Sequence, residues 1–178
     1  MASTYYTYEI YLRKLCNILH PRNILEWGPG RSTCIMHEEC PDANILSIEH
    51  DKLFYNKAQI QHKDNKKINI IYVNHTITPA EDKGYTTYPV RKLLPERLDF
   101  YDLIFIDGRS RCDCLCISFL LLSSAGVVVL HDSNRVNYHP GLEIFPFFYN
   151  NTHKDVSTAV ATKSPQRNLE INDLLYKG

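Results

Sequence analysis

Short apolar runs alternate along the chain with longer stretches in which apolar residues recur at helical spacing. The runs predict five buried strands, at residues 23–27, 44–50, 68–74, 101–108 and 125–132. The stretches between them predict helices at residues 32–40, 51–62 and 111–124. Strands that are apolar on both faces need cover on both faces, so this alternation predicts an α/β fold with a doubly wound, mostly parallel sheet.

The two ends of the chain extend this core, which we place at residues 22–135. An amphipathic helix is expected at residues 3–20, because Pro21 ends the helical spacing there. Residues 141–150 are expected to form a final helix and residues 155–164 a final strand. No repeat, low-complexity tract or linker interrupts the sequence, which we therefore interpret as a single domain over residues 1–178.

One segment, residues 74–99, breaks the alternation with a composition rich in proline, threonine and tyrosine. Only residues 90–98 suggest a short helix there. A connection of this length in a compact domain is either a functional loop or a tolerated surface excursion, and both interpretations stay open. As a functional loop, this lid-like insertion places Tyr85, Tyr88 and Pro89 above a ligand at the sheet edge.

Composition and charge exclude several classes of partner. Of the 178 residues, 44% are hydrophobic and 22% charged, and 20 basic residues balance 20 acidic ones. No net charge draws such a chain to nucleic acid or to a membrane, so we expect neither as a partner. The first residues carry early charges and no long apolar core, which favours a cytoplasmic protein. The expected partner is a small molecule, and a homo-oligomer is left open.

A turn with two glycines follows the first strand, in the sequence Ile-Leu-Glu-Trp-Gly-Pro-Gly-Arg-Ser-Thr at residues 24–33. In a doubly wound sheet, ligands bind beyond the carboxyl ends of the strands where the strand order reverses. Gly28 and Gly30 let the backbone approach a ligand closely, and Ser32 or Thr33 can cap the next helix. The turn lacks the lysine of a phosphate-binding loop, and Thr33 stands where a dinucleotide-binding loop has glycine or alanine.

Two acidic residues indicate a ligand without phosphate. Glu26 precedes the first glycine by two residues, where a carboxylate can bind an amino group. Glu49 ends the second strand, 19 residues after Gly30, where an acid accepts hydrogen bonds from ribose hydroxyls. A ligand that carries a ribose and an ammonium group but needs no phosphate site is S-adenosylmethionine.

These residues belong to four motifs that together resemble class I S-adenosylmethionine-dependent methyltransferases over residues 22–135. The first motif is Glu-Trp-Gly-Pro-Gly at residues 26–30, and the second is the acid-ended strand at residues 45–51. The third is the strand and turn at residues 101–111, which contains Ile-Asp-Gly, and the fourth is the strand at residues 120–132, which has Ser-Ala-Gly where many members have Pro-Gly-Gly. The resemblance implies a Rossmann-like fold of the class I methyltransferase type and S-adenosylmethionine as cofactor.

The resemblance also implies which residues contact that cofactor. The expected contacts lie at the ends of the first four strands: Glu26, Gly28, Pro29, Gly30, Ser32, Thr33, Glu49, His50, His75, Thr76 and Asp107. Within this set, Glu49 is expected on the ribose and the glycines under the methionine moiety. His75 and Thr76 are expected near the adenine.

The ends of the fourth and fifth strands resemble the metal-dependent O-methyltransferases of the catechol and macrocin types, which hold a divalent cation there. The resemblance implies Asp107 and Asp132 as ligands of magnesium, which prefers hard oxygen donors. Without magnesium, the repulsion between the two carboxylates needs another cation. The open candidates are Arg109, Arg135 and a protonated His131.

The catalytic residues are expected at the same strand ends. Asp107 and His131 are the expected pair, because a histidine can remove the proton of an acceptor hydroxyl near neutral pH. Structural roles, a helix cap for Asp107 and a core position for His131, stay open. The expected function is methyl transfer to an oxygen of a small molecule or sugar. The alternative is a protein that binds S-adenosylmethionine without transferring the methyl group, since Ser110 stands where catechol-type enzymes carry a lysine.

Overall fold

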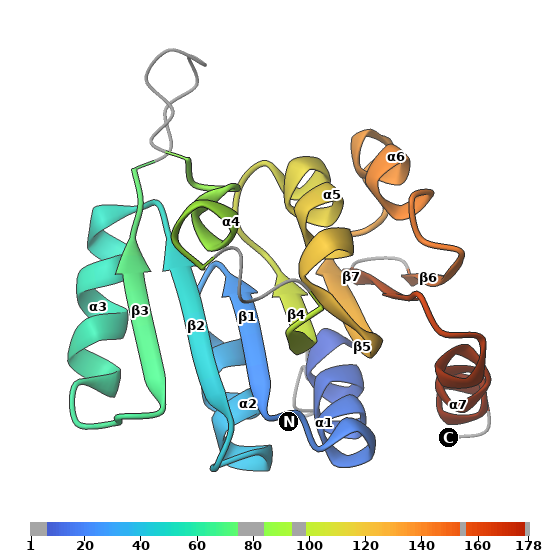
Figure 1. Ribbon diagram of the computed structural model, residues 1–178, viewed down its shortest axis with the longest axis horizontal. Helices are drawn as coiled ribbons and strands as arrows, with labels where there is room; N and C mark the ends of the chain where they lie inside the picture. Colours follow the sequence, from blue (N-terminus) through green and yellow to red (C-terminus); the bar gives the residue numbers. More distant parts are fainter. Residues whose placement is uncertain (1–6, 75–83, 94–98, 154–155, 177–178) are drawn as a thin grey trace.

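The structure, a computed structural model, describes residues 7–74, 84–93, 99–153 and 156–176. Its centre is a seven-stranded sheet with the strand order β3-β2-β1-β4-β5-β7-β6 (Figure 1). The parallel strands are β1 (Asn23–Trp27), β2 (Asn44–Glu49), β3 (Ile68–Tyr72), β4 (Tyr101–Ile106) and β5 (Leu122–His131). The antiparallel strands are β7 (Val156–Thr162), which pairs with β5, and β6 (Phe147–His153), which pairs with β7. The predicted doubly wound, mostly parallel sheet is confirmed.

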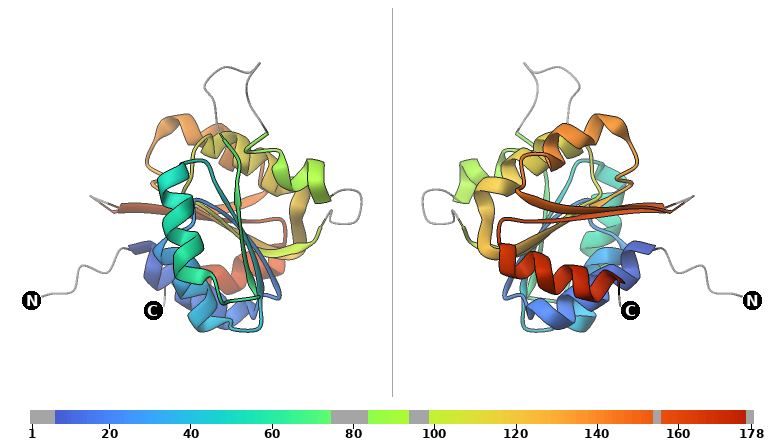
Figure 2. Two further views of the ribbon diagram at one scale, coloured as in Figure 1. Left: turned by 90° about the vertical axis from the view of Figure 1, so that its left-hand side faces the viewer. Right: turned by 90° about the vertical axis from the view of Figure 1, so that its right-hand side faces the viewer.

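Helices cover both faces of the sheet (Figure 2). One face packs against α1 (Thr7–Leu19), α2 (Arg31–Glu39), α3 (Lys52–His62) and α7 (Pro165–Tyr176). The other face packs against α4 (Tyr88–Leu93), α5 (Arg111–Leu121) and α6 (His139–Leu142). Successive strand residues alternate between the two cores, so that Phe105 faces α1 and Ile106 faces α5. No helix among the described residues is long and apolar enough to cross a membrane.

The register of the parallel strands places four chain positions in one row across the sheet. Ile48 pairs with Trp27, Trp27 with Ile106, and Ile106 with Leu130. The residues that follow this row are Glu49, Gly28, Asp107 and His131. The strand order reverses between β1 and β4, so this second row crosses the point where doubly wound sheets bind ligands.

The expected helix at residues 141–150 is wrong, because α6 ends at Leu142 and β6 begins at Phe147. Pro146 supplies no N–H for a helical turn, and the aromatic run at residues 147–149 favours an extended strand. The strand expected at residues 155–164 is present as β7. The sequence pattern therefore located the last strand correctly but missed its partner.

The C-terminal helix α7 was not expected from the sequence. Pro165 occupies its first turn, where a missing N–H costs no helical hydrogen bond. The Ser164 hydroxyl oxygen accepts a hydrogen bond from the backbone N–H of Arg167 at 3.1 Å, as a helix cap does. Its Ile171 packs into the same core as α1, which explains why the helix forms.

Candidate functional site

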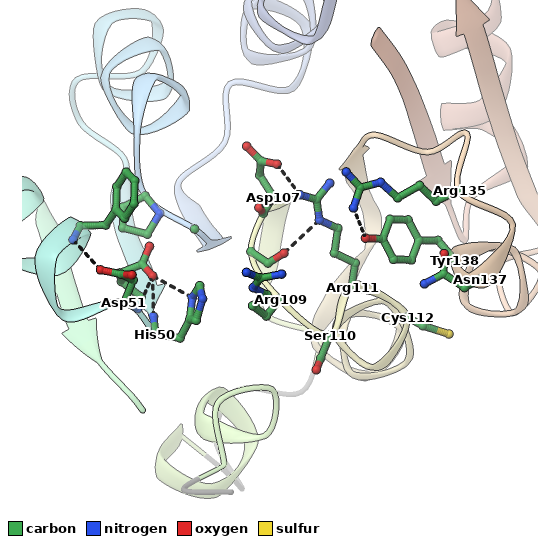
Figure 3. Close-up of a pocket in the computed structure, with 15 residues that line it drawn as sticks. His50, Asp51, Asp107, Arg109, Ser110, Arg111, Cys112, Arg135, Asn137 and Tyr138 are labelled. Atoms are coloured by element: carbon green, nitrogen blue, oxygen red, sulfur yellow. Dashed lines mark hydrogen bonds and ion pairs between the residues drawn. The ribbon is translucent and has the colours of Figure 1, made fainter. Parts of the chain in front are cut away.

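A cavity of about 560 Å³ lies at the row of strand ends and is lined from both sides of the reversal point (Figure 3). Five predicted cofactor residues line it: Gly28, Pro29, Glu49, His50 and Asp107. Further lining residues come from α3, from the β4–α5 turn and from the segment after β5: Asp51, Phe54, Gly108, Arg109, Ser110, Arg111, Cys112, Arg135, Asn137 and Tyr138. The cavity thus occupies the position at which the sequence predicted a ligand.

The remaining predicted cofactor residues lie elsewhere. Glu26, Gly30, Ser32 and Thr33 are not part of the cavity lining. His75 and Thr76 lie outside the described residues. The prediction therefore has geometric support at the ends of β2 and β4 and on the first glycine.

Glu49, at the end of β2, is held at the cavity through one carboxylate oxygen. Its Oε1 accepts hydrogen bonds from the backbone N–H groups of His50 and Asp51, each at 2.7 Å. The Nδ1 atom of His50 lies 2.8 Å from the same oxygen. These contacts fix the carboxylate beside the start of α3, while Oε2 keeps the capacity to accept hydrogen bonds from a ligand.

Asp51 fixes the first turn of α3 and so brings Phe54 to the cavity. Its Oδ1 accepts hydrogen bonds from the backbone N–H groups of Leu53 at 2.8 Å and Phe54 at 3.1 Å. The sequence predicted a helix from residue 51, where Asp51 is the cap, but not the position of Phe54. The signal was present, because Phe54 occupies the first turn after the capped position.

Glu26 lies beneath the glycine turn and has no exposed surface. Its carboxylate accepts hydrogen bonds from the hydroxyls of Ser32, Ser47 and Thr33, the last at 2.7 Å. The Thr33 hydroxyl oxygen in turn accepts a hydrogen bond from the backbone N–H of Gly30 at 3.0 Å. This buried hydrogen-bond network therefore joins the glycine turn to the start of α2.

Replacing Glu26 by glutamine is expected to remove a pH dependence of stability. Burial, opposed by the three hydroxyl donors, raises the pKa of Glu26 to about 7, whereas an ordinary glutamate has a pKa of about 4.3. A raised pKa stabilises the fold fully below the unfolded-state pKa, and this contribution is lost as the pH rises through about 7. From pH 5 to pH 8, the free energy of unfolding of the wild type should fall by about 2–3 kcal/mol relative to Glu26→Gln.

Urea unfolding followed by circular dichroism at both pH values measures this difference. The exposed Glu38 on α2 provides a control, and Glu38→Gln is expected to keep the wild-type pH dependence to within about 0.5 kcal/mol. The same pH dependence in Glu26→Gln and the wild type contradicts the prediction.

Asp107 and His131, the expected catalytic pair, are in contact. His131 Nδ1 lies 2.8 Å from Asp107 Oδ1, and the Tyr8 ring packs edge-on against the imidazole with the centroids 4.7 Å apart. A carboxylate beside Nδ1 favours the tautomer that carries its proton there. The other ring nitrogen, Nε2, is buried, has no hydrogen-bond partner among the described residues and lies 3.6 Å from Asp132 Oδ1.

The geometry also bears on the magnesium expected at Asp107 and Asp132. One ligand atom each from Asp107, His131 and Asp132 lies within 4.8 Å of the others, which is close enough to surround a cation. However, Arg111 Nη2 lies 2.8 Å from Asp107 Oδ1, and Arg111 Nη1 lies 3.4 Å from Asp132 Oδ2. The guanidinium charge is permanent, so a magnesium ion would meet it at close range. With Arg111 in place, the residues present do not fit magnesium.

Arg111 is the site residue whose role the sequence analysis missed. The candidates for a cation between the carboxylates were Arg109, Arg135 and His131. Of these, Arg135 contacts Asp132 Oδ2 at 3.0 Å, but its side chain is 56% exposed. The available signal was the short separation of Asp107, which directly follows β4, and Arg111, which begins α5.

Tyr85 is part of the core and not an exposed wall above the ligand. Its side chain has no exposed surface, and its carbonyl accepts a hydrogen bond from Trp27 Nε1 at 3.2 Å. The hydroxyl lies so close to Gly108 that a Cβ atom there would overlap with it. Tyr88 and Pro89 do not line the cavity either. Tyr85 is therefore a core residue that supports the β4–α5 turn. The lid expected from the insertion as a whole stays a prediction, because residues 75–83 and 94–98 lie outside the described residues.

The strand order, the antiparallel β7 between β5 and β6, and the cavity at the reversal point together define the fold of the class I methyltransferases. No protein-family model matches the sequence, and no curated protein sequence matches it. Solved structures do match. An O-methyltransferase from Bacillus cereus in complex with SAH matches with a TM-score of 0.65 and 16% identity, covering 88% of this chain and 81% of that chain.

Two further solved structures with this fold are named for other reactions. Precorrin-6y C5,15-methyltransferase from Geobacter metallireducens matches with a TM-score of 0.63 and 14% identity, covering 88% of this chain and 87% of that chain. Spermidine synthase from Thermotoga maritima matches with a TM-score of 0.64 and 16% identity, covering 92% of this chain and 61% of that chain. At these identities the likeness establishes the fold, and the reaction must be argued from the site.

Proposed function

We propose that the protein is an S-adenosylmethionine-dependent methyltransferase that methylates an oxygen of a small molecule or sugar. The observation that carries the proposal is the row of Glu49, Gly28, Asp107 and His131 across the reversal point of the sheet. The first three of these residues line one cavity, and His131 contacts Asp107. In this row, Glu49 can accept hydrogen bonds from ribose hydroxyls, and Gly28 has no side chain to block a ligand. Asp107 and His131 form an acid–imidazole pair. The fold supports the same cofactor, because solved O-methyltransferases share it.

In this proposal the cofactor crosses the reversal point from β2 to β4. The Oε2 atom of Glu49 accepts hydrogen bonds from the ribose hydroxyls, and His50 lies beside them. The methionine moiety lies over Gly28 and Pro29, where the backbone can be approached closely. The methyl group then points towards Asp107 and the end of β5.

The acid–imidazole pair favours an acceptor hydroxyl. In the transfer, the bond between the methyl carbon and the sulfonium sulfur breaks as a bond to the acceptor oxygen forms, and S-adenosylhomocysteine leaves. The hydroxyl proton passes to His131 Nε2, while Asp107 holds Nδ1. A buried ring nitrogen without a partner is costly, and an acceptor hydroxyl would supply the missing hydrogen bond. Positioning of the two reactants provides the remaining rate enhancement.

The size and lining of the cavity favour a small acceptor. Its volume of about 560 Å³ lies within the range of about 300–1,000 Å³ that is usual for small-molecule sites. Arg135, Asn137 and Tyr138 form the wall beyond Asp107 and are the proposed acceptor contacts. The balanced charge of the chain gives no support to a nucleic-acid or membrane substrate.

Replacing Glu49 by glutamine is expected to weaken S-adenosylmethionine binding about 10- to 100-fold, because a hydrogen bond to a charged group contributes about 1.5–3 kcal/mol. Glutamine keeps an oxygen for the backbone N–H groups of His50 and Asp51 and replaces the ribose acceptor by a donor. Isothermal titration calorimetry measures the affinity. Glu170→Gln, an exposed position on α7, serves as control and should bind as the wild type does.

An assay for S-adenosylhomocysteine with panels of hydroxylated acceptors tests the reaction itself. Turnover with a hydroxylated small molecule or sugar supports oxygen methylation. Tight cofactor binding without turnover across all panels would instead support the alternative of a binding protein. Unchanged affinity in Glu49→Gln would contradict the ribose contact but not the fold.

A further inference from the structure

The Arg111 guanidinium is a cation held between the ends of β4 and β5 by three hydrogen bonds and two ion pairs. Its Nε donates to the carbonyl of Gly108 at 3.0 Å, Nη1 to the carbonyl of His131 at 2.6 Å and Nη2 to the carbonyl of Asp107 at 3.0 Å. The ion pairs to the Asp107 and Asp132 carboxylates bring the number of contacts to five. Three of the five N–H donors of the guanidinium therefore have carbonyl acceptors, and its charge faces both carboxylates as well.

The Arg111 side chain is buried and packs against an aromatic ring. Its side chain is 9% exposed, and the guanidinium lies 5.6 Å from the centre of the Tyr138 ring. A lysine cannot reproduce these contacts, because its ammonium is a single point with three donors. The planar fork of arginine reaches both strand ends at once, and Figure 3 shows it extended from α5 towards Asp107.

The position of Arg111 explains how two acidic strand ends stay close together. Asp107 and Asp132 repel each other unless a cation lies between them. Arg111 contacts both, and the exposed Arg135 contacts Asp132 alone. The remaining donor set, with Asp107, His131 and Asp132 atoms within 4.8 Å of one another, is of the carboxylate and imidazole type that divalent cations accept.

We propose that Arg111 is a resident cation that takes the place of a divalent metal ion at these strand ends, as a positioning residue for Asp107 and His131. The wild-type protein therefore has no divalent cation at this cluster. Removal of the guanidinium converts Asp107, His131 and Asp132 into a divalent cation site. We also expect methyl transfer to proceed without added metal, and this expectation alone rests on the proposed function.

The test is a titration of chelator-treated protein with Mn²⁺ alone, with free Mn²⁺ followed by electron paramagnetic resonance. Arg111→Ala should gain one site that binds Mn²⁺ at least about tenfold more tightly than the wild type does. Arg111→Met keeps the aliphatic stem and replaces the alanine variant if that variant does not fold. Adding Asp132→Asn to either variant should abolish the new site, and Arg135→Ala, which removes the exposed neighbouring guanidinium, should create none.

Two results of the Mn²⁺ titration overturn the proposal. One is a wild-type protein that binds one equivalent of Mn²⁺ and loses it in Asp132→Asn. The other is a folded Arg111 variant that gains no site. If the wild type is an active methyltransferase, turnover should also stay within about twofold in excess chelator, and loss of turnover restored by Mg²⁺ overturns the proposal too. The Mn²⁺ titration needs no turnover, so failure of the proposed function and failure of the Arg111 proposal are distinguishable.

Discussion

Replacing His131 by asparagine is expected to lower kcat for methyl transfer about 100- to 10,000-fold while the affinity for S-adenosylmethionine changes less than about twofold. Asparagine can keep a donor near Asp107 Oδ1, which now lies 2.8 Å from His131 Nδ1. It has no counterpart of Nε2, the ring nitrogen proposed to take the acceptor proton. His131 does not line the cavity in which we place the cofactor, so cofactor binding should be preserved.

Steady-state kinetics and calorimetry on the same preparations measure both quantities. His20 provides a matched control, because it is exposed and its backbone has a φ of 41°, a conformation that asparagine tolerates well. His20→Asn should keep kcat within about twofold, as surface substitutions away from a site usually do. A His131→Asn variant with wild-type kcat would show that the proton leaves by another route.

Replacing Gly28 by alanine is expected to lower the free energy of unfolding by about 2–4 kcal/mol and to abolish measurable cofactor binding. Gly28 has a φ of +92°, which side chains rarely adopt. An added Cβ would also lie 2.9 Å from the backbone nitrogen of Gly108 and 3.0 Å from the carbonyl carbon of Asp107. Because both neighbours are backbone atoms, the ends of β1 and β4 must separate, and Asp107 moves with them.

Gly30, two residues along the same turn, is the matched control for stability. Its φ of −174° is ordinary extended backbone, and a Cβ there would meet no atom within 4 Å. Gly30→Ala should therefore change the free energy of unfolding, measured by urea titration, by less than about 1 kcal/mol. Equal losses in the two alanine variants would contradict the role assigned to the close approach at Gly28.

The sheet and the row of site residues could be predicted because both depend on local pattern. Near-continuous apolar strands separated by helices indicate a covered parallel sheet, and the ends of parallel strands meet at one edge. Glu49 ends such a strand and Asp107 directly follows one, so their convergence on one cavity could be expected from the sequence. The residues that contact Glu49 and Asp107, by contrast, depend on strand register and turn conformation, which the apolar pattern does not determine.

The features that were missed arise from contacts between distant segments. Tyr85 stands in a polar segment that suggests exposure, but burying its aromatic ring against Gly108 outweighs that local signal. Arg111 is four residues from Asp107, yet its contact with Asp132 requires the register of β4 on β5. Glu26 was interpreted as a ligand contact, although strand alternation places it on the buried α2 side, where three hydroxyls satisfy it.

The wall formed by residues 135–138 has a consequence for how the protein can evolve. This segment lies outside the sheet, between β5 and α6, and only Tyr138 within it is buried. Mutations at Arg135 and Asn137 remove little packing, so natural selection can vary them without loss of the fold. Gly28 and Arg111, in contrast, each join two strand ends and leave little freedom for change. If Arg135 and Asn137 contact the acceptor as proposed, descendants of this chain can diverge in acceptor preference while they keep the same fold.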